Sequence, residues 1–345
     1  MNFYEKIRAN CIITSAAKTI KKNQIHSYQF IDKTPEVGDV VYGKVVRIGQ
    51  HTQIENKSAR LHAINDGSVG VFVFGNRYAP DYYEGFVPPS FCAEVDLLAR
   101  SGLVGKVKYK NNTKQDPTII KILGYIVNKN GEILNTKNFN MIKPISKKKK
   151  EKRAKLILNI GTSMNSGKSM SSAACCWALS SMGYNVRFSK VTGTASLKDI
   201  LNAEDKGAEI INDFTYMGYP STYMLSEEEL LNIFNSIDMK YGNNPNNFWV
   251  VEFADGILQR ETSMLLNNEI VRKRIHKLIF SADSAFSAIG GVNILKDKFN
   301  LIPDAISGVC SSSPLAIREL SEFINIPIFD NINPNFKELI NILKD

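Results

Sequence analysis

The apolar run Lys155–Ile160 leads directly into a loop, Gly161–Ser169, and a stretch rich in alanine and serine follows. The run predicts a buried strand, and Met170–Met182, closed by Gly183, predicts a helix. Successive backbone N–H groups in such a loop form a concave nest for an anion, and the next helix adds the positive end of its dipole. The sequence therefore predicts an anion site at the carboxyl end of a strand in an α/β sheet.

Residue types within the loop indicate that the anion is a nucleotide phosphate. Gly167 lets the backbone approach phosphates without a Cβ, Lys168 can reach the β- and γ-phosphates, and the Ser169 hydroxyl can bind Mg²⁺. This is the P-loop pattern, except that Gly161 and Gly167 enclose five residues and Thr162 holds the usual glycine position. We predict that ATP, with GTP as the alternative, binds with Mg²⁺ through Gly161, Thr162, Ser163, Met164, Asn165, Ser166, Gly167, Lys168 and Ser169.

The displaced glycine resembles the motif of dethiobiotin synthetase and its relatives, and further matches follow in the same order. Lys190 ends a second strand-like run, Asp199 resembles the aspartate that this family uses on Mg²⁺, and Glu252 lies near the end of the strand-like run Phe248–Ala254. The resemblance covers roughly Lys155 to Asp345. It implies that Lys168, Lys190 and Glu252 are catalytic and that Ser311–Pro314 contacts the base. An acid at the end of a buried strand is also where P-loop proteins hold their metal.

Other motifs resemble a less characterised set of P-loop proteins, for which a nucleotide site but no reaction is implied. They are the loop itself, Lys190–Thr194, Tyr219–Tyr223 and Ala254–Glu261. Departures from dethiobiotin synthetase indicate a different substrate: the glycine-rich turn after the acidic strand is replaced, the segment Asp213–Tyr223 is extra, and a β-rich domain precedes the P-loop domain.

The site composition is typical of phosphoryl transfer, and three functions remain open. They are an ATP-dependent ligase or kinase acting on a small carboxylate or amine, a regulatory NTPase whose β domain docks to a partner, and a nucleic-acid-linked ATPase; we favour the first. We expect the acceptor near Thr192, Thr194 and Ser196. Candidates for recognising it are Asp255, Gln259, Arg260, Glu261 and Tyr219–Tyr223, for which a salt-bridged helix start is the alternative interpretation.

Before the P-loop domain the chain reads as short strands, so we predict a β-rich domain at 1–142, a basic linker at 143–155 and the α/β domain at 156–345. Predicted strands are Val40–Ile48, Ser58–Ile64, Val69–Phe74, Leu103–Tyr109 and Ile119–Val127. Asn65–Gly67 predicts a hairpin between the second and third of these, and Asn130-Gly131 predicts a type I′ turn. The strand number favours a barrel of OB or SH3 kind.

The net charge of +9 permits an anionic partner, but much of it lies in the lysine run at 147–155, which is more typical of a solvated linker. The loop Gly75–Phe86 carries aromatic residues and Arg77, yet also Asp81 and Glu84, so packing is favoured over nucleic-acid binding. The five cysteines lack metal or disulfide spacing, and His26, His51, His62 and His276 are isolated. We expect a cytoplasmic homodimer with neither a signal peptide nor a membrane partner.

Overall fold

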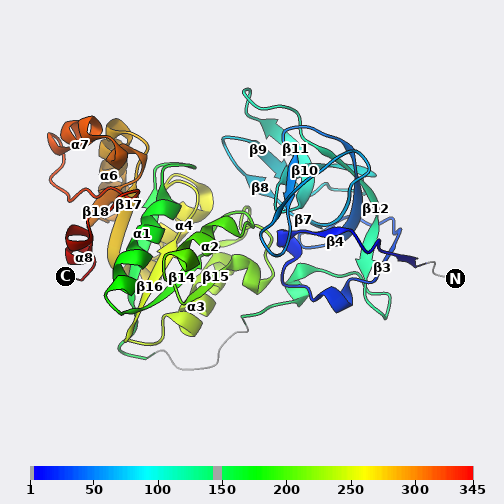
Figure 1. Ribbon diagram of the computed structural model, residues 1–345, viewed down its shortest axis with the longest axis horizontal. Coiled ribbons are helices and arrows are strands. Elements are labelled where there is room, and N and C mark those ends of the chain that lie inside the picture. The colour runs from blue at the N-terminus through cyan, green and yellow to red at the C-terminus, as the bar shows by residue number, and fades with distance from the viewer. Residues whose placement is uncertain (1–3, 143–149, 345) are drawn as a thin grey trace. The chain divides into compact units, whose positions relative to one another are not determined.

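The computed structural model describes residues 4–142 and 150–344. These residues form two compact units (Figure 1). The first unit contains 4–142 together with two short segments of the second half, Thr194–Leu197 and Phe214–Met224. The second unit contains 150–193, Lys198–Asp213 and 225–344. Lys147, Lys148 and Lys149 of the predicted basic linker lie outside the described residues.

The first unit consists of short strands and 3₁₀ helices. Their bounds are β1 (Glu5–Lys6), β2 (Ile12–Ile13), η1 (Ser15–Ala17), η2 (Lys22–Gln24), β3 (Ser27–Gln29), β4 (Val40–Arg47), β5 (Gln53–Glu55), β6 (Leu61–Ala63), β7 (Val69–Phe74), β8 (Arg77–Tyr78), β9 (Tyr83–Phe86), β10 (Glu94–Ala99), β11 (Leu103–Lys110), β12 (Ile119–Val127), η3 (Thr136–Asn138) and η4 (Phe214–Met217).

Five of these strands close into a ring in which each strand pairs with two others. The order around the ring is β4, β7, β11, β10, β12 and back to β4. The β7–β11 pair is parallel and the remaining pairs in the ring are antiparallel. The barrel-like character of the N-terminal part is thereby confirmed, while its assignment to the OB or SH3 kind stays a prediction.

Strand β7 shows why this unit contains such continuous apolar runs. All of its residues are buried. Phe72 and Phe74 belong to one hydrophobic cluster of the unit, and Val69, Val71 and Val73 belong to a second. Since side chains alternate between the two faces of a strand, a strand that is covered on both faces is apolar throughout.

Two local predictions in this unit are wrong. The predicted hairpin around Asn65–Gly67 does not form, because β6 pairs with β5 and β7 pairs with β4. The hairpin that does form joins β5 to β6. In its turn the Asn56 side chain accepts hydrogen bonds from the N–H groups of Ser58 and Arg60. At Asn130-Gly131 only Gly131 has a positive φ, of 81°, so the turn is not type I′.

The second unit alternates strands with helices. Their bounds are β13 (Lys155–Gly161), α1 (Lys168–Ser181), β14 (Asn185–Lys190), α2 (Lys198–Asp205), β15 (Ile210–Asp213), α3 (Glu227–Tyr241), β16 (Asn247–Glu252), α4 (Arg260–Asn267), α5 (Glu269–Arg274), β17 (Ile275–Ser281), α6 (Ala285–Phe299), β18 (Ala305–Ser307), η5 (Val309–Ser312), α7 (Pro314–Ser321) and α8 (Phe336–Lys344).

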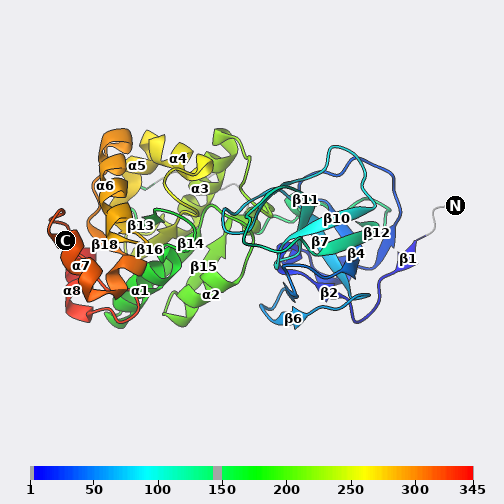
Figure 2. The ribbon, with the colours of Figure 1, turned by 90° about the horizontal axis from the view of Figure 1, so that it is seen from above.

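The strands of this unit form one parallel sheet in the order β15-β14-β16-β13-β17-β18. Figure 2 shows α1, α2 and α8 along one face of the sheet and α3, α4, α5 and α6 along the other. The predicted α/β class with a parallel sheet between helices is confirmed. From β13 the chain moves to β14 and β15 at one edge and later to β17 and β18 at the other, so β13 and β16 lie where the order reverses. Ligands bind at such a point in open α/β sheets.

Helix α1 has the small, buried residues that close packing on the sheet requires. Its buried residues include Ala173, Ala174, Cys175, Cys176 and Ala178. They are buried because the helix packs against α2 and α8 as well as against the sheet. The helix stops as predicted at Gly183, whose φ is 80°. There the N–H of Gly183 donates to Ser180 O and the N–H of Tyr184 to Leu179 O, the hydrogen bonds of a left-handed helix cap.

All five cysteines are free thiols, in agreement with the sequence. Among the described residues, every helix is too short or too polar to cross a membrane.

Candidate functional site: a glycine loop beside buried charges

The glycine loop, Gly161–Ser169, joins β13 to α1 at the reversal point of the sheet. Asn165 and Gly167 have φ values of 63° and 101°, and so turn the backbone back before the helix begins. A Cβ on Gly161 would lie 2.3 Å from Ser166 Oγ and 2.7 Å from Ser281 O, so a larger residue does not fit there. The predicted order of strand, loop and helix is present, and both glycines are required by its geometry.

The Lys168 side chain lies across this loop. Its Nζ donates to Ser163 O at 2.5 Å and is 3.4 Å from Ser166 Oγ. The side chain is buried, and burial lowers its pKa, whereas the charges of Glu252 and Asp255 act in the opposite direction. A buried ammonium whose hydrogen bonds go to neutral groups is well placed to bind phosphate oxygens, because charge-assisted hydrogen bonds are stronger than neutral ones.

Gly308 and Asn331 pack against the glycine loop, and neither was among the site residues predicted from the sequence. The carbonyl oxygen of Ser166 accepts a hydrogen bond from Val309 N, which directly follows Gly308. Asn331 Nδ2 donates to Gly167 O and to Ser171 Oγ, both at 3.1 Å. Gly308 has a φ of 105°, and a Cβ there would lie 2.3 Å from Ser166 O. A glycine directly after a strand was a signal for this position, but nothing in the sequence pointed to Asn331.

A pair of glycine substitutions tests this support. Gly308→Ala is expected to lower the free energy of unfolding by about 2–4 kcal/mol, since it combines a positive φ with a backbone clash. Gly290→Ala is the matched control: it lies inside α6 with nothing within 4 Å of the added Cβ, and is expected to raise stability by up to about 1 kcal/mol. Urea unfolding of both variants measures the difference in the free energy of unfolding. Equal changes in Gly308→Ala and Gly290→Ala would contradict the role of Gly308 beside the loop.

Lys190, Asp199 and Glu252 form a buried charged cluster next to the loop. Lys190 ends β14 and Glu252 ends β16, and the two are register partners in the parallel sheet. Lys190 Nζ donates to Asp199 Oδ2 and lies 3.3 Å from Glu252 Oε1. Asp199 lies in the first turn of α2, and the Ser169 side chain of the glycine loop lies close enough to Asp199 and Glu252 to lower the pKa of both carboxyl groups. The structure thus brings together the loop and the three charged residues singled out in the sequence.

Burial and pairing act in opposite directions on these groups. Burial lowers the pKa of Lys190, but Asp199 and Glu252 outweigh it, and the pKa lies above its ordinary value. Burial raises the pKa of Asp199, but the Lys190 ammonium outweighs it and leaves that pKa lowered. For Glu252, burial dominates and the pKa is raised. Lys190 and Asp199 therefore form a tight ion pair, and Glu252 is the less stabilised carboxylate of the cluster.

The charged cluster has the ligands for Mg²⁺, which needs few protein groups, but not those for a metal that is coordinated by protein side chains alone. No group of three or more His, Cys, Asp or Glu side chains within 4–142 and 150–344 is arranged to hold a metal. Mg²⁺ usually takes one or two carboxylates and completes its shell with water and substrate phosphates. Asp199, Glu252 and the Ser169 hydroxyl supply such a partial set, and Glu252 Oε2 is buried without a hydrogen-bond partner. A cation bound here would contact Glu252 Oε2 and so supply the partner that this buried oxygen lacks.

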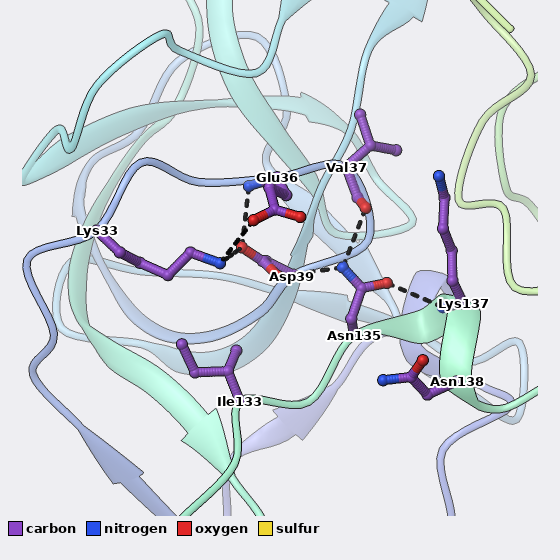
Figure 3. A pocket seen from close by; sticks show the side chains of 8 residues that line it. All are labelled: Lys33, Glu36, Val37, Asp39, Ile133, Asn135, Lys137 and Asn138. Atoms are coloured by element: carbon purple, nitrogen blue, oxygen red, sulfur yellow. Dashed lines mark hydrogen bonds and ion pairs between the residues drawn. The ribbon is translucent and has the colours of Figure 1, made fainter.

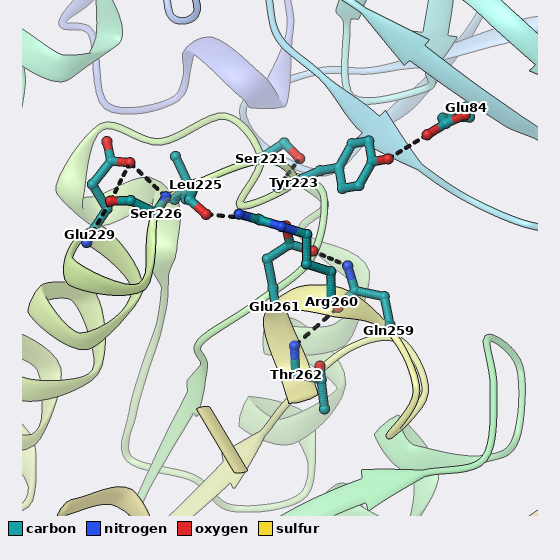
Figure 4. A network of polar contacts seen from close by, with 10 residues as sticks. All are labelled: Glu84, Ser221, Tyr223, Leu225, Ser226, Glu229, Gln259, Arg260, Glu261 and Thr262. Atoms are coloured by element: carbon teal, nitrogen blue, oxygen red, sulfur yellow. Dashed lines mark hydrogen bonds and ion pairs between the residues drawn. The ribbon is translucent and has the colours of Figure 1, made fainter. Parts of the chain in front are cut away.

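The start of α4 is held by a polar network of its own (Figure 4). Gln259 Nε2 donates to Glu261 Oε2, Arg260 Nη1 lies 2.6 Å from Glu261 Oε1, and the Gln259 side chain caps Thr262 N. Arg260 also donates to Leu225 O at 2.8 Å. This is the salt-bridged helix start named as the alternative to acceptor recognition. Asp255, by contrast, lies close enough to act on the pKa values of Lys168 and Lys190.

Other predicted acceptor residues have structural contacts. Thr192 Oγ1 donates to Ala254 O at 2.7 Å. Thr194 and Ser196 lie in the segment Thr194–Leu197 of the first unit, where Thr194 bridges to Ser221. Tyr219–Tyr223 lies in the first unit too, and the Tyr223 hydroxyl donates to Glu84 (Figure 4). Acceptor recognition by these residues stays a prediction.

The side chains of Arg77 and Tyr83 in the loop Gly75–Phe86 pack inside the first unit, as the sequence favoured over nucleic-acid binding. Arg77 is buried, donates to Leu98 O and lies 5.3 Å from the centre of the Tyr82 ring. Tyr83 is buried, and its hydroxyl donates to Gln115 O at 2.7 Å. His51 packs against Tyr82 and Tyr83, and burial, assisted by the charge of Arg77, lowers its pKa to about 4.

The first unit also contains a polar depression (Figure 3). Its lining residues are Lys33, Glu36, Val37, Asp39, Ile133, Asn135, Lys137 and Asn138. Lys33 Nζ lies 2.8 Å from Asp39 Oδ2, and Asn135 Nδ2 donates to Asp39 Oδ1 and to Val37 O, both at 3.1 Å. Since the buried carboxylate is satisfied by these neighbours, we assign the depression a structural role.

Comparison with known proteins identifies no family for the chain. No family model and no curated protein matches it. Solved structures match at low similarity. The signal recognition particle receptor FtsY from Elizabethkingia anophelis in complex with GDP is 11% identical, with 61% of this chain and 70% of that chain covered and a TM-score of 0.38.

Two further structures are similar to the same extent. A ParA family ATPase from Chlorobium tepidum TLS is 15% identical over 55% of this chain and 89% of that chain, with a TM-score of 0.36. A second structure of the same FtsY receptor is 12% identical over 60% of this chain and 69% of that chain, with a TM-score of 0.34. Scores this low carry no argument, so the fold class rests on this chain's own strand order and pairing.

Proposed function

We propose that the second unit binds a nucleoside triphosphate with Mg²⁺ through the glycine loop and transfers or hydrolyses its γ-phosphate. The observation that carries the proposal is the position of Ser169. It belongs to a glycine loop at a helix start, and its side chain lies beside two buried carboxylates, Asp199 and Glu252, which share the Lys190 ammonium. A hydroxyl shared between a phosphate nest and acidic side chains is what a magnesium–nucleotide complex requires.

Each residue of the site has a distinct task in this proposal. Backbone N–H groups of the loop and the start of α1 hold the phosphates, and Lys168 exchanges its contacts with Ser163 O and Ser166 Oγ for phosphate oxygens. Lys190 offsets negative charge that develops during transfer. Asp199, Glu252 and Ser169 would hold Mg²⁺, which neutralises charge on the β- and γ-phosphates when bound. We further propose ATP as the nucleotide and a small carboxylate or amine as the acceptor.

A turnover assay with two variants tests this function. ADP release by the wild-type chain is expected to require Mg²⁺ and to rise when the accepted carboxylate or amine is added from a panel. Glu252→Gln removes one metal-binding charge and is expected to lower kcat by about 100-fold or more, while Glu269→Gln, an exposed acid on α5, leaves it unchanged. Equal turnover by wild type and Glu252→Gln would contradict the proposed metal site.

A regulatory NTPase is the second candidate, and one observation favours it. The segment Thr194–Leu197, which separates Lys190 from Asp199 in the chain, belongs to the first unit. There Leu197 N donates to the buried Glu55 Oε1 at 3.0 Å, and Ala195 N donates to Pro220 O at 3.0 Å. A shift of Lys190 or Asp199 on nucleotide binding would therefore pull on a segment that is anchored in the β-rich unit.

Substitution of Glu55 tests this coupling. Glu55→Leu removes the acceptor for Leu197 N and is expected to change nucleotide turnover several-fold, since an unsatisfied buried N–H costs about 1–3 kcal/mol. Glu55→Gln keeps an acceptor oxygen and is expected to stay near wild type. Wild-type turnover in Glu55→Leu, with the fold intact by circular dichroism, would remove the support for the regulatory function.

A further inference from the structure

Positive charge is concentrated in the N-terminal part of the chain. Residues 1–142 contain 19 lysines and arginines against 12 aspartates and glutamates, whereas residues 156–345 contain 16 against 21. The excess is therefore not confined to the lysine run at 147–155, and it belongs to the β-rich unit and not to the nucleotide-binding unit. Such an asymmetry indicates an anionic partner for the basic unit.

Register places six exposed cations on adjoining strands of the ring. We call them the basic strand surface: Lys44, Arg47, Lys106, Lys108, Lys110 and Lys121. On β4 and β12, Lys44 and Lys121 are directly opposite each other. Lys121 is in turn opposite Glu94 on β10, and Lys106 Nζ of β11 lies 3.3 Å from Glu94 O. The surface thus continues across β4, β12, β10 and β11.

This surface is dominated by cations. The acids beside it are Glu94, Asp116 and Glu84. Asp116 lies 2.6 Å from Lys110 Nζ, with Arg47 also acting on its pKa, and Glu84, opposite Tyr109 on β9, accepts a hydrogen bond from the Tyr223 hydroxyl. Like charges directly opposite each other, as at Lys44 and Lys121, destabilise a sheet. A polyanion bound over Lys44 and Lys121 would offset their repulsion with its own negative charge.

Strand β11 adds an exposed aromatic ring among its lysines. Lys106, Lys108 and Lys110 lie within one stretch of the strand, in which the register against β9 shifts between Val107 and Tyr109. Between them Tyr109 is 62% exposed, and Lys108 Nζ lies 5.2 Å from the centre of its ring and 5.5 Å from that of Phe86. Basic residues that track a backbone and an exposed ring on which a base can stack are the two elements of single-strand binding.

We propose that the basic strand surface binds single-stranded nucleic acid, with phosphates on the lysines and a base stacked on Tyr109. An acidic protein segment would use the lysines but would gain little from an exposed ring, so the ring favours nucleic acid. The surface adjoins the end of the loop Gly75–Phe86, where Phe86 and Glu84 are opposite β11, but it does not include that loop's buried Arg77 and Tyr83. The proposal does not depend on the nucleotide site, which lies in the other unit.

Fluorescence anisotropy with the full chain and a labelled oligo-dT of about 20 nucleotides tests the proposal. The triple variant Lys106→Glu, Lys108→Glu, Lys110→Glu is expected to bind at least tenfold more weakly. Its log–log salt slope between about 50 and 200 mM salt should fall by about 2, since each single-strand phosphate contact contributes about 0.7. Tyr109→Ala should weaken binding by about fivefold or more with an unchanged salt slope.

The matched control makes the same charge change elsewhere on the unit. Lys21→Glu, Lys22→Glu, Lys57→Glu alters three exposed lysines outside the surface and is expected to weaken binding less than threefold. Equal weakening by both triple variants would overturn the proposal, because net charge would then explain binding. No oligo-dT binding by the wild type, no effect of Tyr109→Ala, or equal competition by a polyglutamate peptide would overturn it as well.

Discussion

Replacing Lys168 with alanine is expected to reduce ATP affinity by about 100-fold or more. The lysine would make charge-assisted hydrogen bonds to two phosphates, each worth about 1.5–3 kcal/mol. Among the residues that the structure describes, its hydrogen bonds go to Ser163 O and Ser166 Oγ of its own loop. Alanine is a good residue for a helix start, so the fold should persist. Isothermal titration with a non-hydrolysable ATP analogue measures the loss.

An exposed lysine on the same unit provides the control for this variant. Lys206 follows α2 and its side chain is exposed, so Lys206→Ala should bind the analogue like the wild type. Similar affinity in Lys168→Ala and Lys206→Ala, with both variants folded, would contradict the assignment of the glycine loop as the nucleotide site.

Replacing Lys190 with methionine is expected to have the largest effect on stability. The variant leaves Asp199 and Glu252 buried without their shared cation, and breaking a buried ion pair in this way costs about 3–5 kcal/mol. The pKa of Lys190 is raised in the folded chain, so its contribution is fully present below its unfolded pKa and is lost only as pH rises through the higher folded value. A measurement at neutral pH therefore detects all of it.

Urea unfolding without nucleotide or metal measures this effect. Lys206→Met is the control, since it removes an exposed ammonium and is expected to change stability by less than about 0.5 kcal/mol. A change of similar size in Lys190→Met would contradict the ion pairs to Asp199 and Glu252. Adding Mg²⁺ should restore part of the lost stability, because the cation replaces the missing charge between the carboxylates.

Much of the second unit could be predicted because its motifs are local or aligned by the sheet. The glycine loop needs only the sequence from β13 to α1, and its flanking elements appear where periodicity placed them. Lys190 and Glu252 meet because both end parallel strands, whose carboxyl ends lie at one edge. Asp199 has no such signal, and only its resemblance to a family motif singled it out.

The remaining features depend on contacts between residues far apart in the sequence. Asn331 supports Gly167 from 164 positions away, and no local pattern marks such a pair. The segments Thr194–Leu197 and Phe214–Met224 belong to the first unit, although the first lies shortly after β14 and the second directly follows β15 in the chain. The hairpin of β5 and β6 was missed because its turn is closed by the Asn56 side chain and not by a glycine pair.

Hydrogen exchange of the glycine loop tests the central claim most directly. If ATP and Mg²⁺ bind there, amides of Gly161–Ser169 should exchange more slowly when both are added, because the phosphates accept their hydrogen bonds. The first turn of α1 should be protected with them, and Lys168→Ala should abolish the change. Unchanged exchange across this loop at saturating ATP and Mg²⁺, or protection confined to other segments, would contradict the account.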